Sequence, residues 1–469
     1  MCQPRSAGAS ELATTKHTIR SGAVSRAHST YSLLVRERKM SRTNHPCMPL
    51  IQGLAAGCIV TFLLLQQMQR TAVEDGATGR AAPERDATSA SAPPKPSCED
   101  LPQLTDDQKD ALASTAQTLA TRGKGILAAD ESTPTVGKRL EAAGLTNDAE
   151  TRRAYREVLL AHPRLGDWLG GVILFEETLA QADGQGVPFV TVLNGKGVLA
   201  GVKTDKGLAP IPGSPRETTT RGMDTLLERS KGYYQQGARF AKWRATIRID
   251  AEAGLPTRGA ILANAAGLAQ YAAISQAAGL TPIVEPELLI EGTHSPELFA
   301  EVSERVLGAV YGALSEAGVY LEGTLLKPQM IMAGVDAPEK KATPALTAEL
   351  TLRTLRRRVP PAVPGVFFLS GGQSEEEATV NLDLINRTAA EDVRRRHPWA
   401  LSFSFGRSLQ ASVLKIWAGK AENFTAAVEM AGSLAGANAS AQLGKYEPPH
   451  PSISGSSSLH DPNRGWRPA

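Results

Sequence analysis

Charged side chains recur at alternate positions within short apolar segments of this chain. Lys242 and Arg244 share one such segment, Glu285 and Glu287 share the next, and Lys327 lies in a third. Residues two apart in a strand face the same way, and a charge that is buried singly is costly in free energy. We therefore expect these side chains to form one network with a chemical role.

Within this network, Lys327 is the candidate nucleophile. Neighbouring cations and burial both disfavour a protonated amine, and a neutral amine can attack a ketone to form an imine. Nearby carboxylates can then move the protons that dehydration of the carbinolamine and carbon–carbon cleavage require. Such a mechanism needs neither a metal nor an organic cofactor.

Ligands for a metal are sparse in the part of the chain that carries these charges. All four cysteines lie at or before position 98, and between residues 101 and 446 the histidines are His162, His294 and His397, far apart in the sequence. A zinc centre needs ligands grouped at short spacings. The sequence therefore predicts no metal site, no cofactor and no disulfide in this region.

Two glycine-containing turns indicate phosphate binding. One is Ser370-Gly371-Gly372, which precedes a helix start rich in glutamate, and the other is Ser404-Phe405-Gly406-Arg407. Backbone amides of glycine together with one arginine suit a dianion. A second cationic group follows the first apolar segment and contains Ser132, Lys138 and Arg139. Two phosphate sites at the same end of the fold predict a substrate that carries two phosphates.

The elements that must position these side chains alternate along the chain. Eight short apolar segments are separated by longer helical patterns such as 259–278 and 295–317, which predicts an α/β fold with a closed (β/α)8 TIM barrel. An open doubly wound sheet is the competing fold, but no G-x-G-x-x-G follows the first segment. The predicted strands cover 125–130, 170–175, 199–205, 240–249, 281–288, 324–331, 365–371 and 401–407.

Charge and composition divide the 469 residues into four regions. Residues 1–72 carry nine Lys and Arg against two acidic residues, although the net charge of the whole chain is only +3, so the body is no nucleic-acid-binding module. We expect a basic N-terminal region over 1–72, a disordered linker over 73–100, the barrel over 101–446 and a flexible Pro/Ser/Gly-rich tail over 447–469.

A hydrophobic segment within the first region bears on the location of the protein. Residues 50–65 have about the length of a signal-peptide core and are slightly short for a membrane span. We expect this segment to direct the chain into the secretory pathway, as a cleaved signal or as a membrane tether, at a cell membrane or in a complex plastid. A cytoplasmic location is the alternative.

Several motifs carry a resemblance to a known family. Residues 319–329 (VYLEGTLLKPQ) closely resemble the active-site signature of class I fructose-bisphosphate aldolases, and the supporting matches are GKGILAADEST (123–133), FAKWR (240–244), IVEPE (283–287), FLSGGQSEEEA (368–378) and FSFGRSLQAS (403–412). The resemblance covers about 104–446. It implies that Lys327 forms the Schiff base and that Glu285 is the general acid/base, with Asp130, Lys242 and Glu287 assisting.

The resemblance also implies the substrate contacts. One phosphate would be held by Ser370, Gly371, Gly372, Gly406 and Arg407, the other would lie near Ser132, Thr135, Lys138, Arg139 and Lys203, and Arg244 and Ser404 complete the predicted substrate-binding set. The implied reaction is reversible cleavage of fructose 1,6-bisphosphate to dihydroxyacetone phosphate and glyceraldehyde 3-phosphate. It belongs to glycolysis, gluconeogenesis or the Calvin cycle, and the family is commonly homotetrameric.

This chain departs from the family pattern at three places. Gln329 replaces an Asn or Ser, Thr135 replaces a Ser, and the family's C-terminal tyrosine is missing, since the last tyrosine here is Tyr446. Two alternatives to the implied function are another Schiff-base barrel lyase, such as a transaldolase, and a membrane-tethered scaffold without activity. The presence of Lys327, Glu285 and Arg407 weighs against a scaffold.

Overall fold

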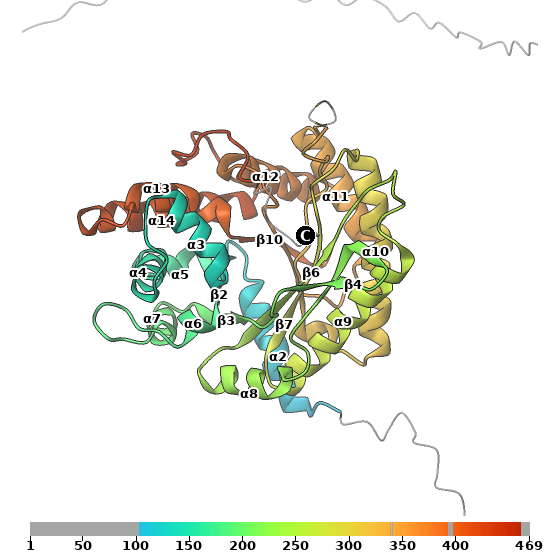
Figure 1. The fold of residues 1–469 in the computed structure, drawn as a ribbon, viewed down its shortest axis with the longest axis horizontal. Helices are drawn as coiled ribbons and strands as arrows, with labels where there is room; N and C mark the ends of the chain where they lie inside the picture. The colour runs from blue at the N-terminus through green and yellow to red at the C-terminus, as the bar shows by residue number, and fades with distance from the viewer. Residues whose placement is uncertain (1–102, 338, 340, 393–396, 461–469) are drawn as a thin grey trace, which may run out of the picture. The chain divides into compact units, whose positions relative to one another are not determined.

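A closed parallel barrel surrounded by helices forms the body of the molecule (Figure 1). The computed structural model describes residues 103–337, 339, 341–392 and 397–460. The barrel strands follow the order β1-β10-β9-β8-β7-β6-β3-β2, which confirms the predicted (β/α)8 architecture. They are β1 (Gly125–Ala129), β2 (Leu169–Leu174), β3 (Leu199–Lys203), β6 (Phe240–Ile247), β7 (Thr281–Leu288), β8 (Leu325–Leu326), β9 (Gly365–Phe368) and β10 (Ala400–Phe405).

Several barrel strands are shorter than the sequence predicts, and the difference is largest for β8 and β9. We expected strands over 324–331 and 365–371, whereas β8 ends at Leu326 and β9 ends at Phe368. Pro328 has no N–H to donate to a strand ladder, and Gly371 and Gly372 have positive φ angles of 51° and 87°, which a strand does not accommodate. Beyond β8 and β9, the two segments pair once more through the isolated bridge between Gln329 and Leu369.

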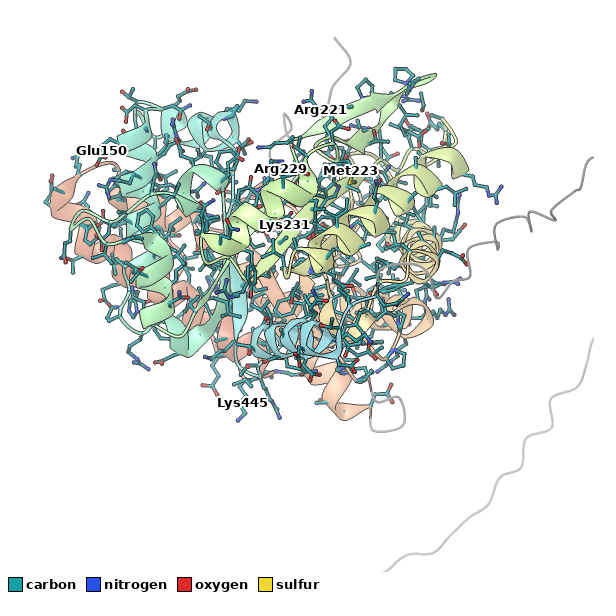
Figure 2. The ribbon with its side chains drawn as sticks, turned by 90° about the horizontal axis from the view of Figure 1, so that it is seen from below. Glu150, Arg221, Met223, Arg229, Lys231 and Lys445 are labelled. Atoms are coloured by element: carbon teal, nitrogen blue, oxygen red, sulfur yellow. The ribbon has the colours of Figure 1, made fainter. Side chains whose placement is uncertain are left out.

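A hairpin that the sequence analysis did not anticipate lies between β3 and the next helix. It consists of β4 (Leu208–Ile211) and β5 (Ser214–Thr220), which pair antiparallel. Arg229, on helix α8 (Leu226–Gln235), donates hydrogen bonds to the carbonyl oxygens of Thr204 (2.9 Å) and Gly222 (2.5 Å). These bonds fix both ends of the segment that carries the hairpin, and Figure 2 shows Arg229 on the outer side of the barrel.

The helices cover the outside of the barrel, and two of them match their predictions closely. The patterns over 259–278 and 295–317 become α9 (Arg258–Ala277) and α10 (Pro296–Glu316), whose N-caps Thr257 and Ser295 accept backbone hydrogen bonds. The others are α2 (Asp106–Leu119), α3 (Thr133–Ala142), α4 (Ala149–Leu160), α5 (Leu165–Trp168), α6 (Glu176–Leu179), α7 (Phe189–Gly195), α11 (Pro344–Arg358), α12 (Glu375–Glu391), α13 (Ala411–Trp417) and α14 (Phe424–Gln442).

Helix α2 closes the end of the barrel at which the strands begin. Its buried residues Ala116 and Leu119 belong to a small interior cluster of apolar side chains with Ile126, Ala128, Ile173, Phe240, Ile283, Leu325 and Phe367. The hydroxyl of Thr281, at the start of β7, also donates to the backbone oxygen of Leu112 (3.0 Å). With this end filled by apolar side chains, polar groups are left to the carboxyl ends of the strands.

The N-terminal predictions concern residues that the structure does not describe. The hydrophobic segment over 50–65 and the linker over 73–100 therefore stay predictions. Within the described ranges, no helix is long and apolar enough to cross a membrane. At the other end, residues 447–460 contact the barrel: His450 hydrogen-bonds Thr379 (3.0 Å), and the backbone N–H of Leu459 donates to Gly372 (2.9 Å). The expected tail thus makes defined contacts over that part.

Candidate active site

A cavity of about 790 Å³ opens at the carboxyl ends of the barrel strands. It collects almost all of the residues that the sequence singled out: Asp130, Ser132, Thr135, Lys138, Arg139, Lys203, Lys242, Arg244, Glu285, Lys327, Ser370, Gly371, Ser404, Gly406 and Arg407. Two predicted residues do not line this cavity. Glu287 lies beside Arg244, and Gly372 lines a neighbouring cavity instead.

The lysines and carboxylates form a connected chain of ion pairs across the barrel interior. The amine nitrogen of Lys327, which follows β8, lies 3.5 Å from Oε1 of Glu285 on β7. The other oxygen of Glu285 lies 3.3 Å from Nζ of Lys242 on β6, and that nitrogen lies 2.7 Å from Oδ2 of Asp130, which follows β1. All four side chains are largely buried, so their charges interact more strongly than they would at the protein surface.

The electrostatic environment distinguishes the two lysines. Burial lowers the pKa of Lys327 and the ammonium of Lys242 acts in the same direction, while Glu285 opposes them. Burial also disfavours charge on Lys242, but Asp130 and Glu285 outweigh it and raise its pKa. For Asp130, burial alone would raise the pKa, yet attraction to Lys242 and Lys327 lowers it. Lys327 is therefore the amine that more readily becomes neutral.

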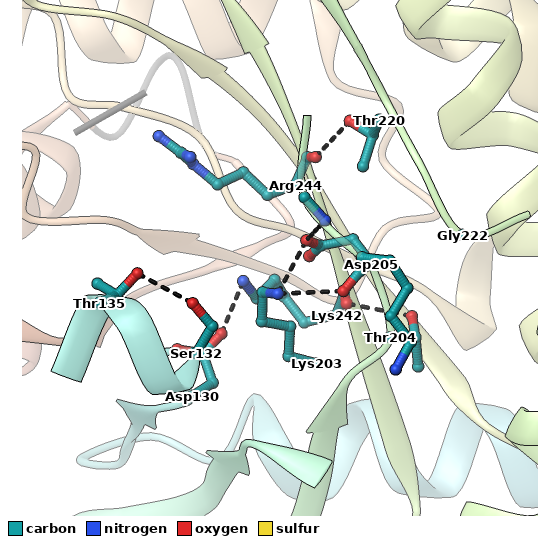
Figure 3. A network of polar contacts seen from close by, with 12 residues as sticks. Asp130, Ser132, Thr135, Lys203, Thr204, Asp205, Thr220, Gly222, Lys242 and Arg244 are labelled. Atoms are coloured by element: carbon teal, nitrogen blue, oxygen red, sulfur yellow. Dashed lines mark hydrogen bonds and ion pairs between the residues drawn. The ribbon is translucent and has the colours of Figure 1, made fainter. Parts of the chain in front are cut away.

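A second set of ion pairs lines the neighbouring wall (Figure 3). Nζ of Lys203, at the end of β3, lies 3.0 Å from Oδ1 of Asp205. Arg244 forms an ion pair with Glu287, and its backbone oxygen accepts a 2.7 Å hydrogen bond from the hydroxyl of Thr220 on the hairpin. The unexpected hairpin therefore supports the strand that carries Lys242 and Arg244.

The predicted phosphate loops lie side by side at the mouth. Ser370, Gly371, Gly406 and Arg407 all line the cavity, and the positive φ of Gly371 is a conformation that glycine adopts without strain. The substituted residue Gln329 places its side-chain nitrogen 3.5 Å from the carbonyl oxygen of Gly371, so this departure from the family pattern touches the loop.

The second cationic group gathers at the start of helix α3. The hydroxyls of Ser132 and Thr135 lie 3.0 Å apart, so the Thr that replaces a Ser keeps its hydroxyl in place. Arg139 forms a 2.5 Å ion pair with Glu131, while Lys138 is exposed at the rim. Both cationic groups therefore line the same cavity as Lys327 and Glu285.

The sequence analysis missed Glu131 and Leu459, which line the cavity, and Gln410, which contacts the cavity residue Arg139 (3.4 Å). Glu131 is paired with Arg139 and also with the buried Arg156 (2.7 Å), and Gln410 hydrogen-bonds the Tyr155 hydroxyl (3.0 Å). Glu131 directly follows Asp130 in the sequence, and this position could have indicated that it lies at the site.

Leu459 was also missed, and it had no such signal, because its contact depends on how the tail folds back. Its backbone oxygen accepts a hydrogen bond from the guanidinium of Arg407.

Comparison with known proteins gives a consistent result. The family model described as fructose-bisphosphate aldolase class-I matches residues 111–465. A fructose-bisphosphate aldolase of Plasmodium falciparum is 52% identical over 345 residues, which are 74% of this chain and 92% of that protein. The cytoplasmic isozyme of Spinacia oleracea is 51% identical over 351 residues, covering 75% of this chain and 96% of the isozyme.

A solved structure of the Plasmodium falciparum aldolase, bound to TRAP and a small-molecule inhibitor, is also similar. Its TM-score is 0.72 and its sequence identity is 51%, with 74% of this chain and 98% of that chain covered. The residues matched by the family model include all eight barrel strands and every residue that lines the cavity. The chain therefore belongs to the class I fructose-bisphosphate aldolases, a family of metal-independent lyases.

Proposed function

We propose that this chain catalyses the reversible cleavage of fructose 1,6-bisphosphate to dihydroxyacetone phosphate and glyceraldehyde 3-phosphate through an imine on Lys327. The observation that carries this proposal is the buried Lys327 amine, which lies 3.5 Å from Glu285 in a cavity that two cationic groups also line. Membership of the family and the names of the relatives support the same substrate.

The proposed mechanism begins with the neutral amine of Lys327 attacking the ketone carbon of the open-chain sugar. Glu285 donates a proton to the carbinolamine hydroxyl, which leaves as water, and a cationic imine forms. The imine then accepts the electron pair of the bond between C3 and C4 as a carboxylate removes the proton of the C4 hydroxyl. We assign this carboxylate to Asp130, with Glu287 assisting through Arg244.

Release of the aldehyde leaves an enamine on Lys327. Protonation at C3 regenerates the imine, and water hydrolyses the imine to give dihydroxyacetone phosphate and the free amine. Throughout, Lys242 remains protonated, because its ammonium is 2.7 Å from Asp130 and 3.3 Å from Glu285. Its charge orients both carboxylates and disfavours protonation of Lys327.

The two phosphates of the substrate hold the reacting carbons over Lys327. We assign one phosphate to the loops with Ser370, Gly371, Gly372, Gly406 and Arg407, and the other to Ser132, Thr135, Lys138, Arg139 and Lys203. Arg244 and Ser404 would contact the sugar between them. The first phosphate has to replace the carbonyl oxygen of Leu459 as the acceptor for Arg407.

The direct test of this proposal is chemical trapping. Borohydride reduction with dihydroxyacetone phosphate should attach the three-carbon unit to Lys327, as read by peptide mass spectrometry, and Lys327→Met should abolish both the label and the cleavage. Lys242→Met serves as the control for a lysine in the same network. A label on another residue, or full activity in Lys327→Met, would disprove the assignment. The chelator EDTA should leave the rate of fructose 1,6-bisphosphate cleavage unchanged, because the proposed mechanism uses no metal.

We also infer the assembly and location that accompany this function. By analogy with the family we propose a homotetramer, which multi-angle light scattering of the purified chain would measure. The spinach relative is a cytoplasmic isozyme, whereas residues 50–65 of this chain predict a targeting segment or membrane tether. Because these two observations point to different compartments, the cellular location of the protein has to be tested separately from its reaction.

A further inference from the structure

A fully buried carboxylate lies behind the phosphate loops, outside the catalytic network. Glu375 is the first residue of α12, and its exposed fraction is 0%. Oε1 accepts a hydrogen bond from the backbone N–H of Ser412 (3.0 Å), and Oε2 accepts bonds from the hydroxyls of Ser412 and Ser452 (2.5 Å for Ser452). No lysine or arginine among the described residues forms an ion pair with it. A buried charge held in this way needs its hydrogen bonds.

Glu375 and its two partners belong to three segments that meet near one phosphate loop. Glu375 follows Gly372 by three positions, and Ser412, on α13, follows Arg407 by five. Ser452 belongs to the tail segment that continues to Leu459 and so to Arg407. One carboxylate thus ties together the glycine turn, the arginine loop and the tail. Ser412 is itself held to the tail by its contact with Ser454 (2.9 Å).

We infer that Glu375 is a positioning residue that fixes the Gly371–Gly372 turn relative to Arg407 and thereby sets the affinity for the phosphate bound there. This inference rests on the proposed function for the identity of the ligand. The physical reason is geometric. A dianion has to meet the backbone amides of one loop and the guanidinium of another at the same time, and charge-assisted bonds weaken when either is displaced.

The chain offers a matched control for this residue. Glu376 is the next residue on the same helical turn but is exposed. Glu375→Gln keeps the shape of the side chain, yet its amide nitrogen cannot accept a hydrogen bond, so at least one of the three donors loses its acceptor. Glu376→Gln removes the same charge one position away without touching Ser412 or Ser452.

The experiment compares these two variants in the full chain. We expect Glu375→Gln to raise the KM for fructose 1,6-bisphosphate about tenfold, the effect of one lost bond to a charged group, with kcat within about twofold. Affinity for inorganic phosphate, measured by calorimetry without turnover, should fall by a similar factor. Glu376→Gln should match the natural chain in both measurements.

Other outcomes overturn the inference. Unchanged phosphate affinity with a lowered Tm would give Glu375 a purely structural role, and a loss confined to kcat would place it elsewhere in the mechanism. If Glu375→Gln does not fold, Ser412→Ala removes a single hydroxyl donor and should raise KM about threefold, a smaller effect because the backbone bond remains. Absence of cleavage by the natural chain would refute the proposed function, while the calorimetric comparison would still test the positioning.

Discussion

At the scale of single residues, the proton on Lys327 governs what this site can do. Burial and the ammonium of Lys242 lower the pKa of Lys327, whereas Glu285, 3.5 Å away, opposes them. The same carboxylate that restrains the loss of the proton is also the group placed to receive and return it. The short chain from Asp130 through Lys242 to Glu285 thus keeps one lysine charged and allows the other to act.

Replacement of Glu285 by Gln tests this arrangement. The amide keeps the volume of the side chain but cannot exchange a proton at neutral pH, so kcat for fructose 1,6-bisphosphate cleavage should fall by about 10²–10⁴-fold, the usual contribution of a positioned acid or base. KM should change far less. Steady-state kinetics decides the matter, and a loss seen only in KM would reassign Glu285 to substrate binding.

Most of the individual site residues could be predicted because strand periodicity places alternate charges on one face. Lys242, Glu285 and Lys327 are found together for that reason. The same rule placed Glu287 in the cavity, where the structure instead pairs it with Arg244. Periodicity predicts which face of a strand a side chain lies on. It does not predict whether a neighbouring side chain separates that residue from the cavity. Contacts from distant segments, such as Leu459 with Arg407, leave no local pattern at all.

At the scale of elements, the eight barrel strands were predictable and the hairpin was not. Strands such as β6 and β7 are buried along their length and so stand out as apolar segments. β5 is read in the sequence as SPRETTT, a polar segment with no apolar alternation, and it is held by bonds to neighbouring elements such as that from Thr220 to Arg244. Such tertiary bonds are invisible to a pattern of hydrophobicity.

The contact between the tail and α12 should depend on pH through His450. The backbone N–H of Ser452 donates to Nδ1 of His450 (3.1 Å), so that nitrogen carries no proton, and Nε2 lies 3.0 Å from the hydroxyl of Thr379. Burial lowers the pKa of His450, although Glu375 and Glu376 oppose this effect. The folded state therefore prefers the neutral ring.

The sign of the expected effect follows from that lowered pKa. The stability that the neutral His450 ring contributes is fully present above the ordinary histidine pKa of about 6.5. It is lost as the pH falls from there toward the lowered pKa of His450 in the folded state. We expect the Tm advantage of the natural chain over His450→Gln to shrink between about pH 7 and pH 5. Thermal melts of the two proteins at several pH values measure this difference. A difference that stays constant with pH would show that His450 does not titrate in this window.

At the scale of the whole molecule, the barrel contains every group that the proposed reaction uses. The cavity is lined by residues between Ala128 and Arg407 together with Leu459, and α2, which begins at Asp106, closes the opposite end of the barrel. Because α2 supplies Ala116 and Leu119 to the interior cluster, the folding unit has to include it. The predicted domain boundary near residue 101 therefore implies that a chain beginning there is both stable and active.

Removing the first hundred residues should separate location from catalysis. A chain that begins at residue 101 keeps α2 and the whole cavity, so its kcat/KM should lie within about twofold of the full chain, the scatter expected when no substrate contact is lost. The hydrophobic segment over 50–65 is lost with the deletion, and a C-terminally tagged full chain should therefore fractionate with membranes or a secretory-derived compartment while the shortened chain does not. Enzyme assays and microscopy of the same two proteins measure the two effects independently. Identical locations would refute a targeting role for 50–65, and a large drop in kcat/KM would mean that the N-terminal region contributes to the barrel or its mouth.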